Sequence, residues 1–305
     1  MGFGAVNKIT QAHDAGRYWL TGFRKAVSAA ATTTSGWIDY SYFPGTPTAN
    51  FYASSPLTAA RMATDDPLNP IPGIYVPQVN ADQTQHVLRM MLMTQASGAT
   101  STANARQSLY LCDYLLYYPF VDTDAVGEEQ AMTNLQTIPR YAHGQVIAIA
   151  QSAAVTVGQF TMTYTNQDGT PGRVSQNHFT LGSITGGGQI AATQQSGAGF
   201  TPFLDLQAGD YGVQSIESVT FTAPGGGLIA LAIVKPLLHH TATQECRVST
   251  GTVDSFGSAD EYISLVHQAG APEIKNGAVI NLLAQGLAGS LASSALVGTL
   301  ETVWN

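Results

Sequence analysis

The sequence predicts a mainly β protein: an antiparallel β-sandwich or jelly-roll body with extended N-terminal and C-terminal arms. Two observations within residues 85–238 lead to this class. Short apolar or alternating segments separated by Gly- and Pro-containing turns recur there, and no strand–helix–strand alternation accompanies them. A third observation is that segments of different character flank this body. We therefore divide the chain into 1–84, 85–238 and 239–305.

Within the body, residues 108–120 are rich in Leu and Tyr at both odd and even positions, which is typical of a strand covered on both faces. Residues 159–165 instead alternate apolar residues with Thr. A turn containing Asp168-Gly169 follows them, so segments 159–165 and 173–181 are expected to form a hairpin. Farther along, Ile216 breaks the parity that Val213 and Val219 share, which predicts a β-bulge.

The first segment begins with a helical period over residues 5–31. Residues that recur every three or four positions form one stripe of this helix: Val6, Ile9, His13, Gly16, Leu20, Phe23 and Val27. This pattern predicts a helix, which either docks on the body or serves as a partner-binding arm.

Residues 32–80 contain a short predicted strand at 36–43 and then seven prolines between Pro44 and Pro77. Such a density of proline forbids regular helices and central strands. Aromatic residues recur among the prolines, so two interpretations stand side by side. The segment is an extended arm that anchors itself on a surface through its aromatic rings, or it is a proline-rich loop on its own domain.

The third segment has no charged residue between Asn276 and Leu300. A membrane span is one interpretation, but polar residues interrupt the stretch and no cluster of Lys or Arg flanks it. The i, i+4 spacing of Leu283, Leu287 and Leu291 favours a helix packed against protein. An extended apolar arm is the alternative, because the glycine content is high for a helix.

Charge is scarce: only 10% of the residues are charged, and 12 Lys and Arg against 20 Asp and Glu give a net charge of −8. A nucleic-acid-binding protein needs a basic patch, so this class is disfavoured. An ordinary enzyme with a charged, solvated surface is disfavoured as well. We expect copies of the chain or other partners to cover much of its surface.

Motifs for catalysis or for cofactor binding are absent from the sequence, including G-x-S-x-G, H-E-x-x-H, the P-loop and C-x-x-C. His239-His240 are adjacent, so in a strand they point to opposite faces and cannot easily chelate one ion. We therefore expect no catalytic residue, no cofactor and no metal site. The sequence leaves open whether Asp122, Asp124 and Glu128 bind a cation, as their spacing resembles part of a calcium loop.

Two further patterns have a simple interpretation. Trp37, Tyr117 and Tyr118 could form a platform for a sugar ring, but core or interface packing explains them better. Cys112 and Cys246 have no motif spacing, which favours separate, reduced and buried thiols. Together with a beginning that lacks an apolar stretch of signal-peptide length, this predicts folding in a cytoplasm.

Three stretches resemble structural proteins of tailed bacteriophages. They are the hairpin sequence Phe160–Arg173, the run Gly36–Asp39 leading to Asn50–Ala53, and the turn and strand Leu206–Ile216. The chain is most similar to jelly-roll decoration (cement) proteins of capsids. This resemblance implies a virion protein on the capsid surface, assembled in the host cytoplasm, with the major capsid protein and further copies of itself, as a dimer or trimer, for partners.

The sequence thus leads to a non-enzymatic protein that binds the outside of a phage capsid and bridges capsomers. The alternatives are a tail, fibre or host-glycan-binding β-sandwich protein, a tailspike-type hydrolase and a major capsid protein. We expect neither nucleic acid nor membrane among its partners, and contacts through segments 1–60 and 276–305. The predicted partner-interface residues are Trp19, Phe23, Trp37, Tyr40, Tyr42, Phe43, Phe51, Tyr52, Leu283, Leu287 and Leu291.

Overall fold

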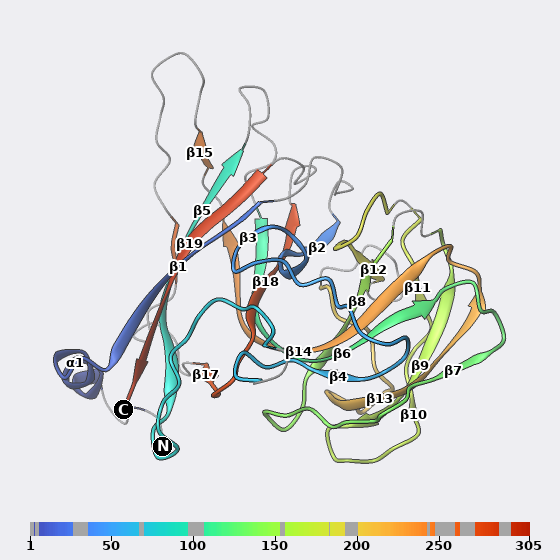
Figure 1. The fold of residues 1–305 in the computed structure, drawn as a ribbon, viewed down its shortest axis with the longest axis horizontal. Coiled ribbons are helices and arrows are strands. Elements are labelled where there is room, and N and C mark those ends of the chain that lie inside the picture. The colour runs from blue at the N-terminus through green and yellow to red at the C-terminus, as the bar shows by residue number, and fades with distance from the viewer. Residues whose placement is uncertain are drawn as a thin grey trace.

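The computed structural model describes residues 3, 6–26, 36–66, 70–96, 107–152, 156–182, 184–192, 201–242, 245–247, 260–262, 272–286 and 294–305. These residues are mainly in β-strands, which confirms the predicted class of an antiparallel β-sandwich. Three sheets form the described part of the body (Figure 1). In the part of the chain that the structure describes, one α-helix, α1 (Val6–Asp14), and one 3₁₀ turn, η1 (Tyr40–Tyr42), accompany the sheets. No described helix is long and apolar enough to cross a membrane.

The central sheet is antiparallel throughout. In spatial order its strands are β12 (Ile190–Ala192), β8 (Gln145–Ala150), β14 (Leu228–Ala242), β6 (Gln107–Asp122), β18 (Ile280–Gly286) and β2 (Trp37–Asp39), with β4 (Ala60–Arg61) also paired to β6.

The other two sheets lie near opposite ends of the long axis of the molecule (Figure 1). The terminal sheet has the order β15 (Glu245–Arg247), β5 (Gln85–Ala96), β19 (Ser294–Trp304), β1 (Tyr18–Ala26) and β3 (Gly45–Thr46), with β16 (Asp260–Tyr262) and β17 (Glu273–Ile274) on β5. The hairpin sheet has the order β10 (Arg173–Val174), β9 (Gln159–Asn166), β13 (Val213–Ala223) and β7 (Glu129–Ala131), with β11 (His178–Phe179) on β9. Its hairpin and the bulge after Ile216 are as predicted.

Strands β6 and β14 unite the molecule, because their long ladder contributes to the cores beneath both the terminal sheet and the hairpin sheet. Leu109 and Leu111 of β6 pack with residues of the terminal sheet, whereas Leu115 and Val121 pack with residues of the hairpin sheet. Irregularities in the register interrupt the ladder at three places, one of them at Pro236. Such bulges re-aim side chains, so one pair of strands can serve two cores.

The proline-rich segment covers the other face of the central sheet. Tyr52, Met62 and Ile71 from this segment pack with Tyr114 and Tyr117 of β6 in a third buried cluster. Of the two interpretations offered by the sequence, the structure has the proline-rich loop on its own domain. Strand β6 is therefore buried on both faces, as its composition predicts.

The predicted helix over residues 5–31 is wrong beyond Asp14. Gly16 has a φ of +71° and ends the helix, with its N–H bonded to the carbonyl of His13. The next residues, from Tyr18, are aromatic, β-branched or long apolar side chains that suit a strand. They form β1, in which Phe23 is buried and approaches Gly298 so closely that a Cβ there would collide with its ring.

The described parts of the C-terminal segment are extended, so the helix alternative is wrong for Leu283. Leu283 is buried in β18, between β6 and β2, while Leu287 and Leu291 lie outside the described residues. Strand β19 pairs with β1 over the whole length of β1. The two terminal segments thus complete one sheet, and that sheet combines strands from all three segments of the predicted division.

A buried ion pair holds four parts of the chain together. Arg140 donates to both carboxylate oxygens of Asp113 in β6, at 3.0 and 2.7 Å, and also to the carbonyls of Met62 and Tyr114. The N–H of Val279 donates to the same carboxylate at 2.9 Å. Both charges are removed from water, so each depends on the other for its solvation.

Arg140→Met should lower the free energy of unfolding by about 3–5 kcal/mol, because it leaves the carboxylate of Asp113 buried without its counter-charge. Denaturant titration measures the loss. The matched control Arg61→Met removes an exposed guanidinium and should change stability by no more than about 0.5 kcal/mol. Equal midpoints for the two variants would contradict the role assigned to this ion pair.

Lys25 in β1 is a second buried charge. Its side chain points to the inner face of the terminal sheet, where Nζ donates to the carbonyl of Pro47 at 2.8 Å. Burial lowers the pKa of Lys25 from 10.5 to about 8, and the negative charge of Asp39 opposes this shift. The folded chain therefore releases this proton at a lower pH than the unfolded chain does.

The free energy of unfolding should rise by about 1–2 kcal/mol between pH 7 and pH 9.5. The sign follows from the lowered pKa of Lys25: the penalty for its buried charge is complete below pH 8 and diminishes as the pH rises from 8 toward 10.5, where the folded chain has released the proton and the unfolded chain still holds it. Denaturant titrations across this range measure the effect. Lys25→Met should remove the rise, and an equal rise in this variant would contradict the assignment.

Candidate functional site

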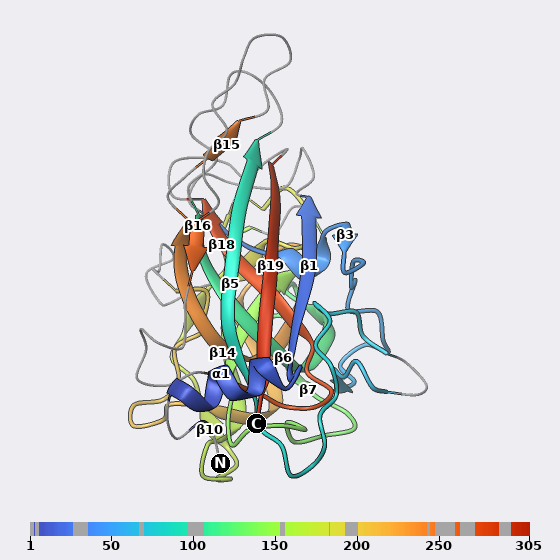
Figure 2. The same cartoon turned by 90° about the vertical axis from the view of Figure 1, so that its left-hand side faces the viewer.

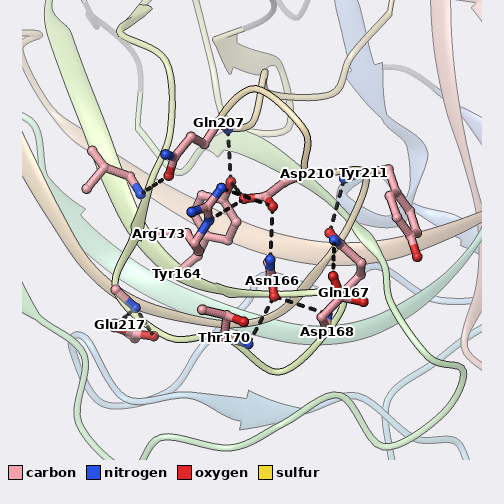
Figure 3. A network of polar contacts seen from close by, with 12 residues as sticks. Tyr164, Asn166, Gln167, Asp168, Thr170, Arg173, Gln207, Asp210, Tyr211 and Glu217 are labelled. Carbon is pink, nitrogen blue, oxygen red and sulfur yellow. Dashed lines mark hydrogen bonds and ion pairs between the residues drawn. The ribbon is translucent and has the colours of Figure 1, made fainter.

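The hairpin sheet brings together two of the stretches that the sequence analysis relates to phage structural proteins (Figure 3). Arg173 pairs with Tyr164 across the β9–β10 hairpin. The loop at 206–212 lies against this hairpin and leads directly into β13. We call the hairpin turn 166–172 and the loop 206–212 together the hairpin platform. Residues 44 positions apart in the sequence thus share one polar network.

Asp210 is the centre of this network. Its carboxylate accepts hydrogen bonds from Arg173 Nε at 2.9 Å, from Tyr164 Oη at 2.7 Å and from Asn166 Nδ2 at 2.9 Å. Tyr164 Oη accepts in turn from the backbone N–H of Gln207 at 2.9 Å. The loop is therefore fastened to the hairpin through both its side chains and its backbone.

Side chains also order the hairpin turn from within. Asn166 Oδ1 accepts from the backbone N–H groups of Asp168 and Thr170, both at 3.0 Å. At the other end of the turn, Glu217 in β13 accepts from the N–H of Gly172 and from the hydroxyl of Thr165. A loop with so many internal acceptors is held in one conformation.

The electrostatics suit a structural role better than a catalytic one. The hydrogen bond from Arg173 is the largest cause that lowers the pKa of Asp210 to about 2. Its carboxylate is consequently ionised throughout the neutral range and cannot act as a proton donor there. Burial raises the pKa of the Tyr164 hydroxyl, and its hydrogen bond to Asp210 raises that pKa further. The network therefore fixes a shape.

Tyr211 is the exposed aromatic residue on the hairpin platform, with 60% of its surface accessible. Its ring stands edge-on to that of His143, with centroids 5.2 Å apart. Its backbone is held on both sides, because its N–H donates to Gln167 and its carbonyl accepts from Gln145. A rigidly held aromatic ring in water is typical of a contact surface.

Two of the three acidic residues that the sequence offers for a cation, Asp122 and Asp124, bond to backbone N–H groups. Asp122 accepts the N–H of Asp124, and Asp124 accepts the N–H of Gly226, so both carboxylates order turns. His239 lies within β14, where it stacks on Tyr110. Within the described part of the chain, no group of three or more His, Cys, Asp or Glu residues is placed to hold a metal ion.

Other predictions concern the core. Trp37, Tyr117 and Tyr118 are buried and form no exposed sugar platform. Cys112 is buried without a disulfide partner, as predicted, and burial raises the pKa of its thiol well above the usual range. The side chain of Cys246 lies outside the described residues.

The structure separates the predicted partner-interface residues into two groups. Trp19 and Phe51 are exposed, Tyr42 is half-buried against Phe51, and these remain candidates for contact with a partner. The others that the structure describes lie in the core of the chain itself, because strand periodicity and the folded-back loop turn them inward: Phe23, Trp37, Tyr40, Phe43, Tyr52 and Leu283.

Sequence reasoning missed three exposed residues beside Trp19, namely Tyr18, Leu20 and Tyr75. The error for Leu20 follows from the assumed helix. Leu20 and Phe23 share one face at a helical period of 3.6, but they lie on opposite faces of a strand. A strand period applied from Tyr18 onward would have placed Leu20 outside.

Comparisons with known proteins give little. No protein-family model matches the chain, and no curated protein matches it. Similar solved structures include a chain from the structure of infectious bursal disease virus Gx strain, which is 9% identical. The alignment covers 94% of this chain and 81% of that chain, with a TM-score of 0.20. A mutant VP2 protein of the same virus, in derived T=1 particles, gives 9% identity, coverages of 94% and 77%, and a TM-score of 0.18. TM-scores this low carry no argument about this protein.

Asp210→Asn should loosen the hairpin platform, because it removes the negative charge that Arg173 and Tyr164 share. We expect amide hydrogen exchange in the turn 166–172 to quicken severalfold while exchange in β6 and β14 is unchanged. In the wild type the same loosening should develop only as the pH falls from about 4 to about 2, where Asp210 takes up its proton. Unchanged exchange in the variant would contradict the role of Asp210.

Proposed function

We propose that this chain is a non-enzymatic virion structural protein, which binds the outside of a phage capsid and stabilises it by bridging capsomers. Such a protein needs two separate contact surfaces on a body that does not deform. Strand β1 and the hairpin sheet lie toward opposite ends of the long axis of the molecule (Figure 1). The observation that carries the proposal is that each of these elements has large exposed apolar side chains on or beside it.

At one end, beside the terminal sheet, Trp19 and Tyr75 are exposed together on one face of β1, and Tyr18 and Leu20 are exposed on its other face. The rings of Trp19 and Tyr75 are in edge contact, with centroids 5.9 Å apart, and Thr21 donates to the carbonyl of Tyr75. Both contacts come from side chains of odd-numbered residues of β1, so they hold the proline-rich segment against one face of the strand. The result is a preformed aromatic contact surface, which loses little conformational entropy on binding.

At the other end, the hairpin platform presents Tyr211 on an ordered loop. The ladder of β6 and β14 runs between the two ends, and β6 is buried along almost all of its length. Burial of apolar surface contributes about 25 cal/mol per Å² before the costs of ordering. Each contact can therefore be weak, because many copies on a repeating shell act together.

The low charge of the chain agrees with this proposal. Only 10% of its residues are charged, so its surface offers little protection against association. On a capsid, partners would cover part of that surface. We assign the protein accordingly to the surface of a virion assembled in the host cytoplasm, with the major capsid protein and its own copies as partners.

One observation favours a second candidate, a tail or fibre protein that binds host glycans. Tyr211 stands beside His143 and among Gln145, Gln167 and Gln214, a combination of ring and amides that suits sugar recognition. Specific binding of the purified protein on a glycan array, lost in Tyr211→Ser, would favour this candidate over capsid binding.

Tyr75→Ser and Tyr211→Ser should each weaken binding to capsid particles that lack this protein, by about tenfold or more, because each removes a large apolar contact. The two variants test the two ends separately. Co-sedimentation of the purified protein with such particles measures the affinity, and the double variant should bind more weakly than either single variant.

Leu135→Ser is the matched control, because Leu135 is 55% exposed, compared with 57% for Tyr75 and 60% for Tyr211. It should bind particles as the wild type does. If all three variants bind equally well, the two ends are not the contact surfaces. If the wild type itself fails to bind, the proposal of capsid bridging is wrong.

A further inference from the structure

Strand β1 has an open edge in the terminal sheet (Figure 2). On one side it pairs with β19 without a break in register, and on the other side β3 pairs with it only at Arg24 and Lys25. Among the described residues, no backbone group pairs with the stretch Tyr18–Phe23 on that second side.

The hydrogen bonds fix which backbone groups point outward. The carbonyl of Arg17 accepts from Trp304 in β19, whereas the N–H of Ala26 donates away from β19 to Pro44. Since alternate residues of a strand direct their N–H and C=O groups to opposite sides, the even-numbered residues face the open edge. Tyr18, Leu20 and Gly22 therefore present both donors and acceptors there.

This edge lacks the protection that edge strands of monomeric proteins usually have. The stretch Tyr18–Phe23 contains no charged residue and no proline, and no bulge interrupts it. Its outer face continues into an apolar hollow of about 280 Å³, whose lining includes Leu20, Met91, Met93 and Val297. Both the backbone edge and the adjoining apolar face are therefore suited to a further strand.

The unpaired stretch of β1 is short and bounded at both ends, and this favours a second copy of the same stretch as the strand that pairs with it. The chain turns at Gly16 and β3 occupies the edge from Arg24, so the open window runs from Arg17 to Phe23. Leu20 is its midpoint. Antiparallel pairing of the window with itself, about a two-fold axis through Leu20, places Tyr18 opposite Gly22 and uses the whole window.

Side chains complement one another in the same arrangement. The two Leu20 side chains meet on the outer face, where they extend the apolar hollows of both copies into one surface. Arg24 follows one end of the window, and the exposed Asp14, which ends α1, precedes the other end. Antiparallel pairing therefore brings opposite charges of the two copies to the same end of the joined window, once on each side of the axis.

We propose that a second copy of this chain adds to the β1 edge, so that two terminal sheets become one continuous sheet across a two-fold axis. This inference locates the self-association that the proposed function includes, and it does not require a capsid. It can therefore fail or succeed independently of capsid binding.

Gly22→Pro tests the edge directly. Proline removes the outward N–H of residue 22, which makes no bond within the described chain, and edge strands tolerate it. Two-fold symmetry removes two hydrogen bonds between the copies, so the dimer should weaken by about tenfold or more. Gly22→Ala keeps the N–H, fits without a collision, and should dimerise as the wild type does. Sedimentation velocity without particles measures all three proteins.

A cross-link provides a second readout if Gly22→Pro fails to fold. In a Cys246→Ser background, Leu20→Cys should form an intermolecular disulfide in a non-reducing gel, whereas the equally exposed control Leu135→Cys should not. A monomeric wild type, or a dimer that neither Gly22→Pro nor the cross-link reports, overturns the proposal. If the wild type is monomeric and Gly22→Pro weakens its binding to particles, the edge accepts a strand of the capsid and not a second copy of this chain.

Discussion

The pairing of β6 with β14 is the constraint on which the rest of the structure depends. These two strands supply side chains to all three buried clusters, and their bulges direct those side chains to two different cores on one face. The other face is closed by a proline-rich segment that cannot form regular structure of its own. Arg140 joins that segment to β6, because it pairs with Asp113 of β6 and also donates to the carbonyl of Met62. The same residue therefore helps both to cover the central sheet and to fix the proline-rich segment.

Local patterns in the sequence predict local structure well here. The alternation at 159–165 predicts strand β9 and its hairpin, and the mixed parity of 108–120 predicts a strand buried twice. The failures arise where tertiary pairing decides. Residues 18–26 have a helical period but become a strand, because Gly16 ends the helix and β19 offers a partner along the full length of β1. The spacing of Leu283 fails for the same reason, since β18 fills a place in the central sheet.

The candidate site shows the same division between local and distant information. The turn at 166–172 is visible in the sequence, but the contact of Asp210 with Arg173 and Tyr164 is not, because it joins segments that only the fold of the hairpin sheet brings together. In the same way, the exposed group around Trp19 includes Tyr75 from another segment. A chain with few charges thus arranges its exposed apolar residues on rigid supports at both ends.

The central claim is that these two ends contact the subunits of a repeating shell. The number of copies in purified virions, determined by quantitative mass spectrometry against the major capsid protein, tests it most directly. The account predicts a copy number comparable with the number of capsomers in the shell. A handful of copies per particle, as expected for a component of the tail, would contradict it.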